Sequence, residues 1–280
     1  MLHSEQKKEA LEIYDKAVQK YNSTYGEVTK NCNILYEKRR ATISIIDAVN
    51  ILINSIANSP KEFQSTLTRI EQEKEDFRKA EEFAAEAYDA AVKSGVGVAT
   101  GVAGGAAVAS LAPSAAMWVA TTFGTASTGT AISALHGAVA TNAALAWLGG
   151  GSLAAGGAGV AGGQALLALA GPIGWGLAGA SAATSIASLS IKNKKLSAEA
   201  IAKAKEVTVA GALLHESDAK ILNLISETES LFQNVGESYG KLKSLAASDY
   251  SVLSEEHQLG LGALVNNTLS LAEMLNKTVD

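Results

Sequence analysis

The segment LEIYDKAVQKYNSTYGEVTKNCNILYEKRRATISIIDAVNILINSI (residues 11–56) decides the fold of this chain. Fourteen of its positions follow one another in alternating steps of three and four residues, and twelve of the fourteen are apolar. A spacing of 3.5 residues over this length predicts one long helix with the buried seam of a coiled coil. We expect this helix to run from residue 5 to residue 58. Its seam consists of Leu11, Tyr14, Val18, Tyr21, Tyr25, Val28, Cys32, Leu35, Arg39, Thr42, Ile46, Val49, Ile53 and Ile56.

Two seam positions, Arg39 and Thr42, are polar. An arginine on a buried seam either pairs with an acidic residue elsewhere in the chain or interrupts the packing, and the pattern does not choose between these. Cys32 is the only cysteine, so it forms no internal disulfide, which suits a reducing compartment. A buried thiol without a basic neighbour is unreactive, so we expect Cys32 to pack as a small apolar side chain rather than act as a redox thiol.

The next residues, Ser59-Pro60-Lys61-Glu62, end one helix and begin another. They offer an N-cap serine, a proline at the first helical position and a glutamate that closes a capping box. The helix that follows, up to residue 93, has one apolar and one charged face. Residues 1–93 are therefore predicted to form an antiparallel helical hairpin. The apolar face consists of Phe63, Leu67, Ile70, Phe77, Ala84, Tyr88 and Ala91.

Residues 94–191 contain no Asp, Glu, Lys or Arg, and His136 is their only ionisable side chain. They hold 20 of the 26 glycines. An ordinary soluble domain carries roughly 25% charged residues, so nearly all of this stretch must be buried in lipid or in protein. We therefore divide the chain into an N-terminal helical arm (1–93), a hydrophobic, glycine-rich, membrane-active head (94–191) and a C-terminal helical arm (192–280).

Strong helix breakers divide the head into four segments. Three of the segments are 18 to 20 residues long, the length that a helix needs to cross a hydrocarbon core of about 30 Å. The other is too long for one span, and the small polar run from Gly124 to Thr130 is expected to interrupt it. The breakers are Pro113, Gly149-Gly150-Gly151 and Gly171-Pro172. The segments are 95–112, 114–148, 152–170 and 172–191.

Small residues recur at four-residue spacing in the head, a pattern that lets helix backbones approach closely in lipid. Alanine and glycine add little to the free energy of insertion, so each segment depends on a few larger apolar residues. We therefore expect conditional insertion by helices that need one another, packed either in a soluble bundle or in an assembled pore. The expected packing residues are Gly97, Gly101, Gly105, Gly159 and Gly163.

The run TGTAISALHGAVATNAALAWLGGGSLAAGGAGVAGG (residues 128–163) resembles the glycine-rich hydrophobic hairpin of the interferon-inducible small membrane proteins. That family has a similar small-residue helix, a Gly-Gly-Gly turn and a second helix. Charged helical arms around an uncharged head also resemble the α-helical pore-forming toxins of the cytolysin type, whose hydrophobic head is usually shorter. Both resemblances imply membrane permeabilisation through assembled helices, and neither implies catalytic residues.

Four further head residues are candidates for a functional role. Trp118, Trp147 and Trp175 lie near segment ends, where interfacial aromatic side chains belong, although packing anchors in a small-residue core fit equally well. His136 is either a pH switch, because it is the one titratable group of the head, or an ordinary histidine satisfied by a hydroxyl such as that of Ser133 or by a backbone carbonyl.

The three-and-four spacing returns in the C-terminal arm and predicts a second long helix from residue 196 to residue 247. It matches the first helix in length, so the two are expected to pack side by side. Lys93 and Lys192 flank the head and place both arms on one face of a membrane if the number of spans is even. The second seam is Leu196, Ala200, Val207, Ala210, Leu214, Ile221, Leu224, Leu231, Val235, Leu242 and Leu245, with Lys203, Ser217, Thr228 and Ser238 as polar exceptions. After a break at Ala247-Ser248-Asp249, a last amphipathic helix carries Leu261, Leu264, Leu271 and Leu275.

No pattern in the sequence predicts catalysis or cofactor binding. Walker A, G-x-S-x-G and HExxH sequences are absent, and the four histidines are scattered. Two G-x-G-x-x-G matches, residues 157–162 and 174–179, are expected by chance in glycine-rich sequence, and a Rossmann unit needs alternating strands and helices. We expect no enzyme, no cofactor and no metal site. The net charge of −5 argues against a nucleic-acid partner.

These patterns predict a membrane-inserting, oligomeric protein that forms pores or otherwise permeabilises a bilayer, as a toxin or defence effector. The alternative is a non-catalytic coiled-coil scaffold or membrane-remodelling protein whose head is a buried assembly core. The expected partners are a lipid bilayer and further copies of the chain, and a second protein component is left open. The polar N-terminal residues do not form a signal peptide. We expect synthesis in the cytosol, membrane association when active and, in the case of export, release by a signal-independent route.

Overall fold

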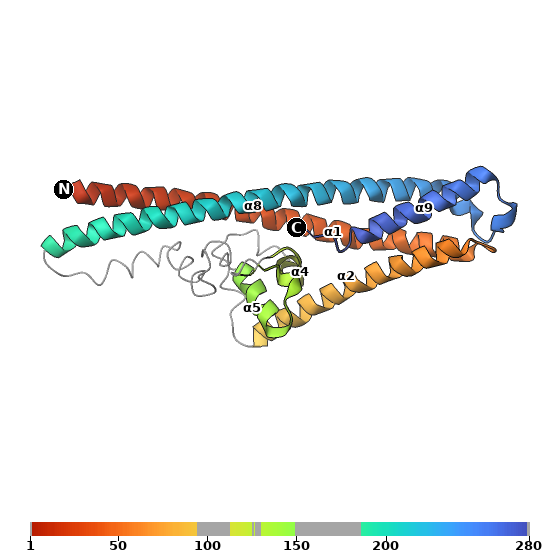
Figure 1. The fold of residues 1–280 in the computed structure, drawn as a ribbon, viewed down its shortest axis with the longest axis horizontal. Coiled ribbons are helices and arrows are strands. Elements are labelled where there is room, and N and C mark those ends of the chain that lie inside the picture. Colours follow the sequence, from red (N-terminus) through yellow and green to blue (C-terminus); the bar gives the residue numbers. More distant parts are fainter. Residues whose placement is uncertain (1, 94–112, 125, 127–129, 149–185, 279–280) are drawn as a thin grey trace. The chain divides into compact units, whose positions relative to one another are not determined.

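The computed structural model describes residues 2–93, 113–124, 126, 130–148 and 186–278. This part of the chain is almost entirely helical and contains no strand, which confirms the predicted all-α fold (Figure 1). Its isolated β-bridge joins Ala57 and Asp249. The α-helices are α1 (Leu2–Ser55), α2 (Lys61–Lys93), α4 (Pro113–Phe123), α5 (Gly137–Leu148), α8 (Ile186–Leu242) and α9 (Glu255–Glu273). The short 3₁₀ helices are η2 (Ile132–Ala134), η3 (Lys243–Leu245) and η4 (Tyr250–Val252).

The chain divides into two compact units. Unit 1 consists of residues 1–31 and 84–219, and unit 2 consists of residues 32–83 and 220–280. The long helices α1 and α8 each contribute their first part to unit 1 and their second part to unit 2. Each unit therefore contains a length of both helices.

Unit 2 contains two antiparallel helical hairpins. In the first, Lys74 of α2 pairs with Asp47 of α1, and the Tyr36 hydroxyl donates a hydrogen bond to Glu81 at 2.7 Å. Residue numbers rise along one helix as they fall along the other, so the two helices predicted for residues 1–93 run antiparallel. In the second hairpin, Lys277, just after α9, forms an ion pair of 2.8 Å with Glu227 of α8.

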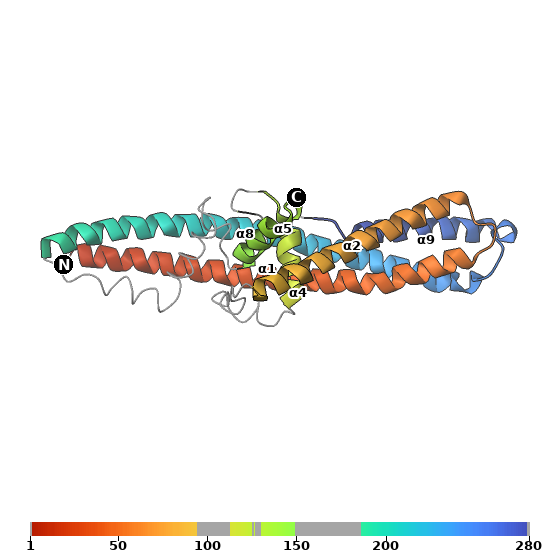
Figure 2. The ribbon, with the colours of Figure 1, turned by 90° about the horizontal axis from the view of Figure 1, so that it is seen from below.

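The helices α1 and α8 run side by side in the same direction (Figure 2). In unit 2, Lys38 pairs with Glu229, and the Ala247 amide donates to the Ser55 hydroxyl at 3.1 Å. In unit 1, the Asn31 side-chain amide donates to the Asp218 carboxylate at 2.8 Å. The difference in residue number stays near 190 from pair to pair, as it must for parallel helices. The pairing expected from their matching lengths is present.

The turns of the two hairpins bind each other through their backbones. The Ala57 amide donates to the Ser248 carbonyl, and the Tyr250 amide donates to the Ala57 carbonyl, both at 2.9 Å. The Asn58 side chain adds a hydrogen bond of 2.9 Å to Asp249. These contacts require left-handed backbone at Asn58 (φ 56°) and at Ala247 (φ 59°). The helices end at these turns. α1 ends at Ser55, three residues before its predicted end at residue 58, and α8 ends at Leu242, five residues before its predicted end at residue 247.

The predicted seam of α1 is buried at thirteen of its fourteen positions, and Leu11 is half-buried. Even the polar exceptions Arg39 and Thr42 are buried, at 0% and 1% exposure. Cys32 is also fully buried, as expected for a small apolar side chain. In the last helix, the predicted residues Leu261, Leu264, Leu271 and Leu275 are all buried.

The prediction for α8 needs two corrections. The helix begins at Ile186, ten residues before the predicted start, because residues 186–195 contain no glycine or proline that would stop it. Its buried seam includes Ala204 and Asp218, whereas Lys203 is exposed and Ser217 half-buried. A step of four or three back from Val207 reaches Lys203 or Ala204, and a step of three or four on from Leu214 reaches Ser217 or Asp218. The contact with α1 decides which residue of each pair is buried.

Candidate functional site

The described part of the head is a small uncharged unit in which α4, η2 and α5 pack against one another. Neither α4 nor α5 contains a charged residue. Trp118 lies at its centre with 1% exposure, and its ring meets that of Phe123 edge-on at 5.7 Å between centroids. The other buried side chains are those of Met117, Val119, Ala120, Thr121, Ile132, Ala140 and Ala144. In the described head, Trp118 therefore packs among apolar side chains.

A small polar run separates the two described head helices. α4 is described from Pro113 onward. It ends at Phe123, directly before the small polar run that was expected to interrupt segment 114–148. The Ile132 amide then donates to the Gly124 carbonyl at 2.9 Å, which closes the connection between the helices. α5 is described from Gly137 to Leu148, and the predicted breaker Gly149-Gly150-Gly151 lies outside the described residues.

The other candidate residues of the head are placed only in part. His136 is exposed and lies between η2 and α5, and no hydrogen bond joins it to Ser133. Trp147 lies in the last turn of α5. Outside the described residues are Trp175 and the glycines Gly97, Gly101, Gly105, Gly159 and Gly163. Across the described ranges, no helix combines the length and the apolarity that a membrane span requires.

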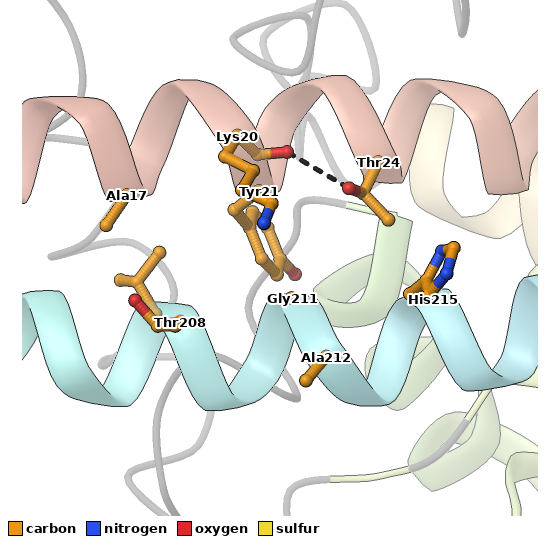
Figure 3. Close-up of a pocket in the computed structure, with 9 residues that line it drawn as sticks. Ala17, Lys20, Tyr21, Thr24, Thr208, Gly211, Ala212 and His215 are labelled. Atoms are coloured by element: carbon orange, nitrogen blue, oxygen red, sulfur yellow. Dashed lines mark hydrogen bonds between the residues drawn. The ribbon is translucent and has the colours of Figure 1, made fainter.

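A pocket that the sequence reasoning missed lies in unit 1, between α1 and α8 (Figure 3). Its volume is about 320 Å³. The side of α1 contributes Ala17, Lys20, Tyr21 and Thr24. The side of α8 contributes Val207, Thr208, Gly211, Ala212 and His215. The signal for it in the sequence was Gly211, a glycine next to the seam position Ala210 in the middle of a long helix, where a close approach or missing volume is expected.

The pocket exists because large and small side chains face each other across the two helices. The Tyr21 ring points from α1 toward Gly211 of α8, where a Cβ atom would lie 3.9 Å from the ring (Figure 3). Ala17 and Ala212 leave the space beside this contact unfilled. Burial raises the pKa of the Tyr21 hydroxyl to about 12, because the phenolate would lose its hydration.

The polar groups around the pocket differ in what they can still bind. The Thr24 hydroxyl donates to the Lys20 carbonyl at 3.1 Å, and the Thr208 hydroxyl donates to the Ala204 carbonyl at 2.7 Å. The side chains of Lys20 and His215 are exposed and form no ion pair or hydrogen bond with another residue of the described ranges. No carboxylate lines the pocket. Its available donors are therefore a lysine ammonium and an imidazole.

Unit 2 holds the other unusual polar group, the buried guanidinium of Arg39. Its Nη2 atom donates to the backbone carbonyl of Lys277 at 2.6 Å. Burial lowers the pKa of Arg39 to about 9, because the cation is removed from water. An acidic partner and a break in the packing were the two expectations for Arg39, and the acceptor of this bond is instead a backbone carbonyl after α9.

The described residues contain no group of three His, Cys, Asp or Glu side chains that could hold a metal ion. Ser254 and His257 lie 3.0 Å apart between Oγ and Nδ1, but Ser254 is the N-cap of α9 and accepts from the His257 amide. Comparisons with protein-family models, with curated proteins and with solved structures found no match. The resemblances drawn from residues 128–163 and from the charged arms therefore stay expectations.

Proposed function

We propose that this protein inserts its head into a lipid bilayer as an oligomer and permeabilises the membrane. The observation that carries the proposal is the absence of Asp, Glu, Lys and Arg from residues 94–191. A stretch of this length without charge needs a non-aqueous neighbour along most of its surface. The flanking arms carry every Asp, Glu, Lys and Arg of the chain and would stay in water.

The proposal sets a requirement on the helices of the described head. Val139 on α5 is 63% exposed, as single apolar residues of the arms such as Val252 are. At 1.5 Å per residue, α4 and α5 are roughly 17 and 18 Å long, whereas a hydrocarbon core is about 30 Å thick. Insertion therefore includes a change of conformation in which the head helices lengthen.

Assembly follows from the composition of the head. Leucine and valine contribute about −0.3 to −0.6 kcal/mol each to insertion, and the alanines and glycines between them add little. One head alone gains too little free energy for a stable span. Packing between helices through small residues, within one head or between copies, supplies the remainder.

The sharpest test places one charge on the head without disturbing its packing. Val139→Asp changes an exposed residue of α5, so the fold should be kept. An aspartate at the centre of a span costs about 2.5 to 3.5 kcal/mol, so dye release from liposomes should fall roughly 100-fold. The matched control is Val252→Asp, because Val252 is 79% exposed and lies outside the head. The control should release dye at the parent rate.

A second substitution tests assembly separately from lipid binding. Gly159→Leu makes the head more apolar but adds a large side chain at an expected helix contact. Close packing predicts that the variant still floats with liposomes while its oligomer and dye release are lost. A scaffold whose head is a permanently buried core predicts that the parent protein itself leaves the dye inside. That result would overturn the proposed function in favour of the scaffold.

A further inference from the structure

We propose that the pocket between α1 and α8 in unit 1 binds a single-chain anionic amphiphile, that is, an alkyl chain that ends in a carboxylate or a phosphate. This inference concerns a site on the charged arms and does not rest on the proposed action of the head. It follows from the size of the pocket, its apolar floor and the two unengaged donors at its rim.

The size of the pocket sets the size of the ligand. Its 320 Å³ lies at the lower end of the range for small-molecule sites. At about 30 Å³ for each water-sized group, this volume holds roughly ten heavy atoms. That is the size of an alkyl chain of eight to ten carbons whose head group lies outside this volume, at the rim, and it is too small for a nucleotide or a two-chain lipid.

The walls of the pocket select an apolar body. Ala17, Val207 and Ala212 offer methyl groups, and the Tyr21 ring offers an aromatic face beside Gly211. The threonine hydroxyl hydrogens are already committed to carbonyls of their own helices. A sugar or another polyhydroxy ligand would find few donors here, so the greater part of the ligand should be hydrocarbon.

The rim of the pocket selects an anionic head. Lys20 contributes an ammonium, and His215 contributes at least one ring N–H donor in either tautomer. Neither side chain is engaged by a carboxylate in the described ranges, whereas Lys38, Lys74 and Lys277 of unit 2 each pair with one. A carboxylate or phosphate on the ligand would supply the missing acceptor, and a charge-assisted bond of this kind is stronger than a neutral one.

The experiment is calorimetric titration of the full chain with decanoate, decyl phosphate and decanol. Decanoate or decyl phosphate should bind at least tenfold more tightly than decanol, because the neutral head gains no charge-assisted bond. Anionic phospholipid vesicles form a separate arm. If the protein binds the vesicles but neither decanoate nor decyl phosphate, it recognises a membrane surface and the proposal is wrong.

Two variants locate the binding in the pocket. Lys20→Gln should weaken decanoate at least tenfold, whereas Lys16→Gln, on the same helix but outside the pocket, should leave it unchanged. Gly211→Leu should fill the space and abolish binding, whereas Gly236→Leu, at an open position of α8, should not. Equal affinity of parent and Lys20→Gln overturns the proposal even if Gly211→Leu fails to fold. The Val139→Asp variant should bind decanoate normally, so this site and the proposed action of the head can fail independently.

Discussion

The helices α1 and α8 pack against each other in both units, but with different side chains. In unit 2, α1 contributes mainly aliphatic residues such as Leu35 and Ile46, both fully buried. In unit 1 it contributes tyrosines such as Tyr14 and Tyr21, and α8 contributes Gly211 near the second of these. One pair of helices thus forms two kinds of interface.

This difference teaches where unfilled space is tolerated. The tyrosine interface leaves a pocket of about 320 Å³ between the two helices. Filled aliphatic packing favours stability, whereas unfilled space favours a ligand or a rearrangement.

The largest expected effect separates the two interfaces directly. Leu35→Ala in unit 2 and Leu214→Ala in unit 1 each remove a leucine that is at most 1% exposed. The cost of such a change depends on how far the site can collapse, so Leu35→Ala should cost about 4 to 5 kcal/mol and Leu214→Ala about 2 to 3 kcal/mol. Unfolding in urea, monitored by amide hydrogen exchange in each unit, gives both losses of free energy. Equal losses would mean that the two interfaces are equally well packed.

The next effect concerns the polar pair of unit 1. Asn31→Ala removes the donor to Asp218, whose side chain is only 8% exposed, and should cost about 1 to 3 kcal/mol. The double variant Asn31→Leu/Asp218→Leu replaces the pair by apolar side chains and should recover most of this loss. A double-mutant cycle in urea measures the coupling. Additive losses would show that the hydrogen bond does not contribute.

A pH effect should distinguish the tyrosine interface from the aliphatic one. The pKa of Tyr21 is about 12 in the folded chain, above the ordinary 10 of the unfolded chain. The contribution of the Tyr21 hydroxyl to the free energy of unfolding is therefore complete below pH 10 and is lost as the pH rises through 12. Between pH 8 and pH 11 the parent should lose about 1 kcal/mol more than Tyr21→Phe, which keeps the ring. Unfolding free energies at the two pH values test this, and identical losses in both proteins would contradict it.

The smallest effect lies in the turns of unit 2. Ala247 has a φ of 59°, which strains an alanine, so Ala247→Gly should stabilise the protein by about 0.5 to 1 kcal/mol. Asn58 has nearly the same φ of 56° but tolerates it, so Asn58→Gly should bring little or no gain. The midpoints of thermal unfolding compare the two variants. A gain from Asn58→Gly as large as that from Ala247→Gly would argue against strain at Ala247.

The sequence predicted the helices and their buried faces well, because a spacing of 3.5 residues depends only on neighbours along the chain. It found the seam of α1 even at Arg39 and Thr42, which composition alone would have placed outside. It placed Lys203 on the seam of α8 where the structure buries Ala204, an error that arises because both positions fit the spacing. That choice depends on which face meets α1, and periodicity carries no information about the partner helix.

The candidate sites were harder to predict for the same reason. Arg39 binds the carbonyl of Lys277, and a backbone acceptor leaves no trace in a pattern of side chains. The pocket depends on Gly211 facing Tyr21, two residues that lie far apart in the chain. In the head, α4 ends at Phe123 directly before the small polar run from Gly124, because glycine and short polar residues interrupt a helix locally.

The bond between the two hairpin turns has a consequence for the synthesis of the chain. Ala57 is made early, but its partners Ser248 and Tyr250 follow only after the whole head has been translated. At 5 to 20 residues per second, roughly 8 to 30 s separate the appearance of Lys93 from that of Tyr250. For that interval the uncharged head is attached to a single hairpin. Unit 2 can therefore close only after the head has been made, so the order of translation places the completion of the head before the closure of unit 2.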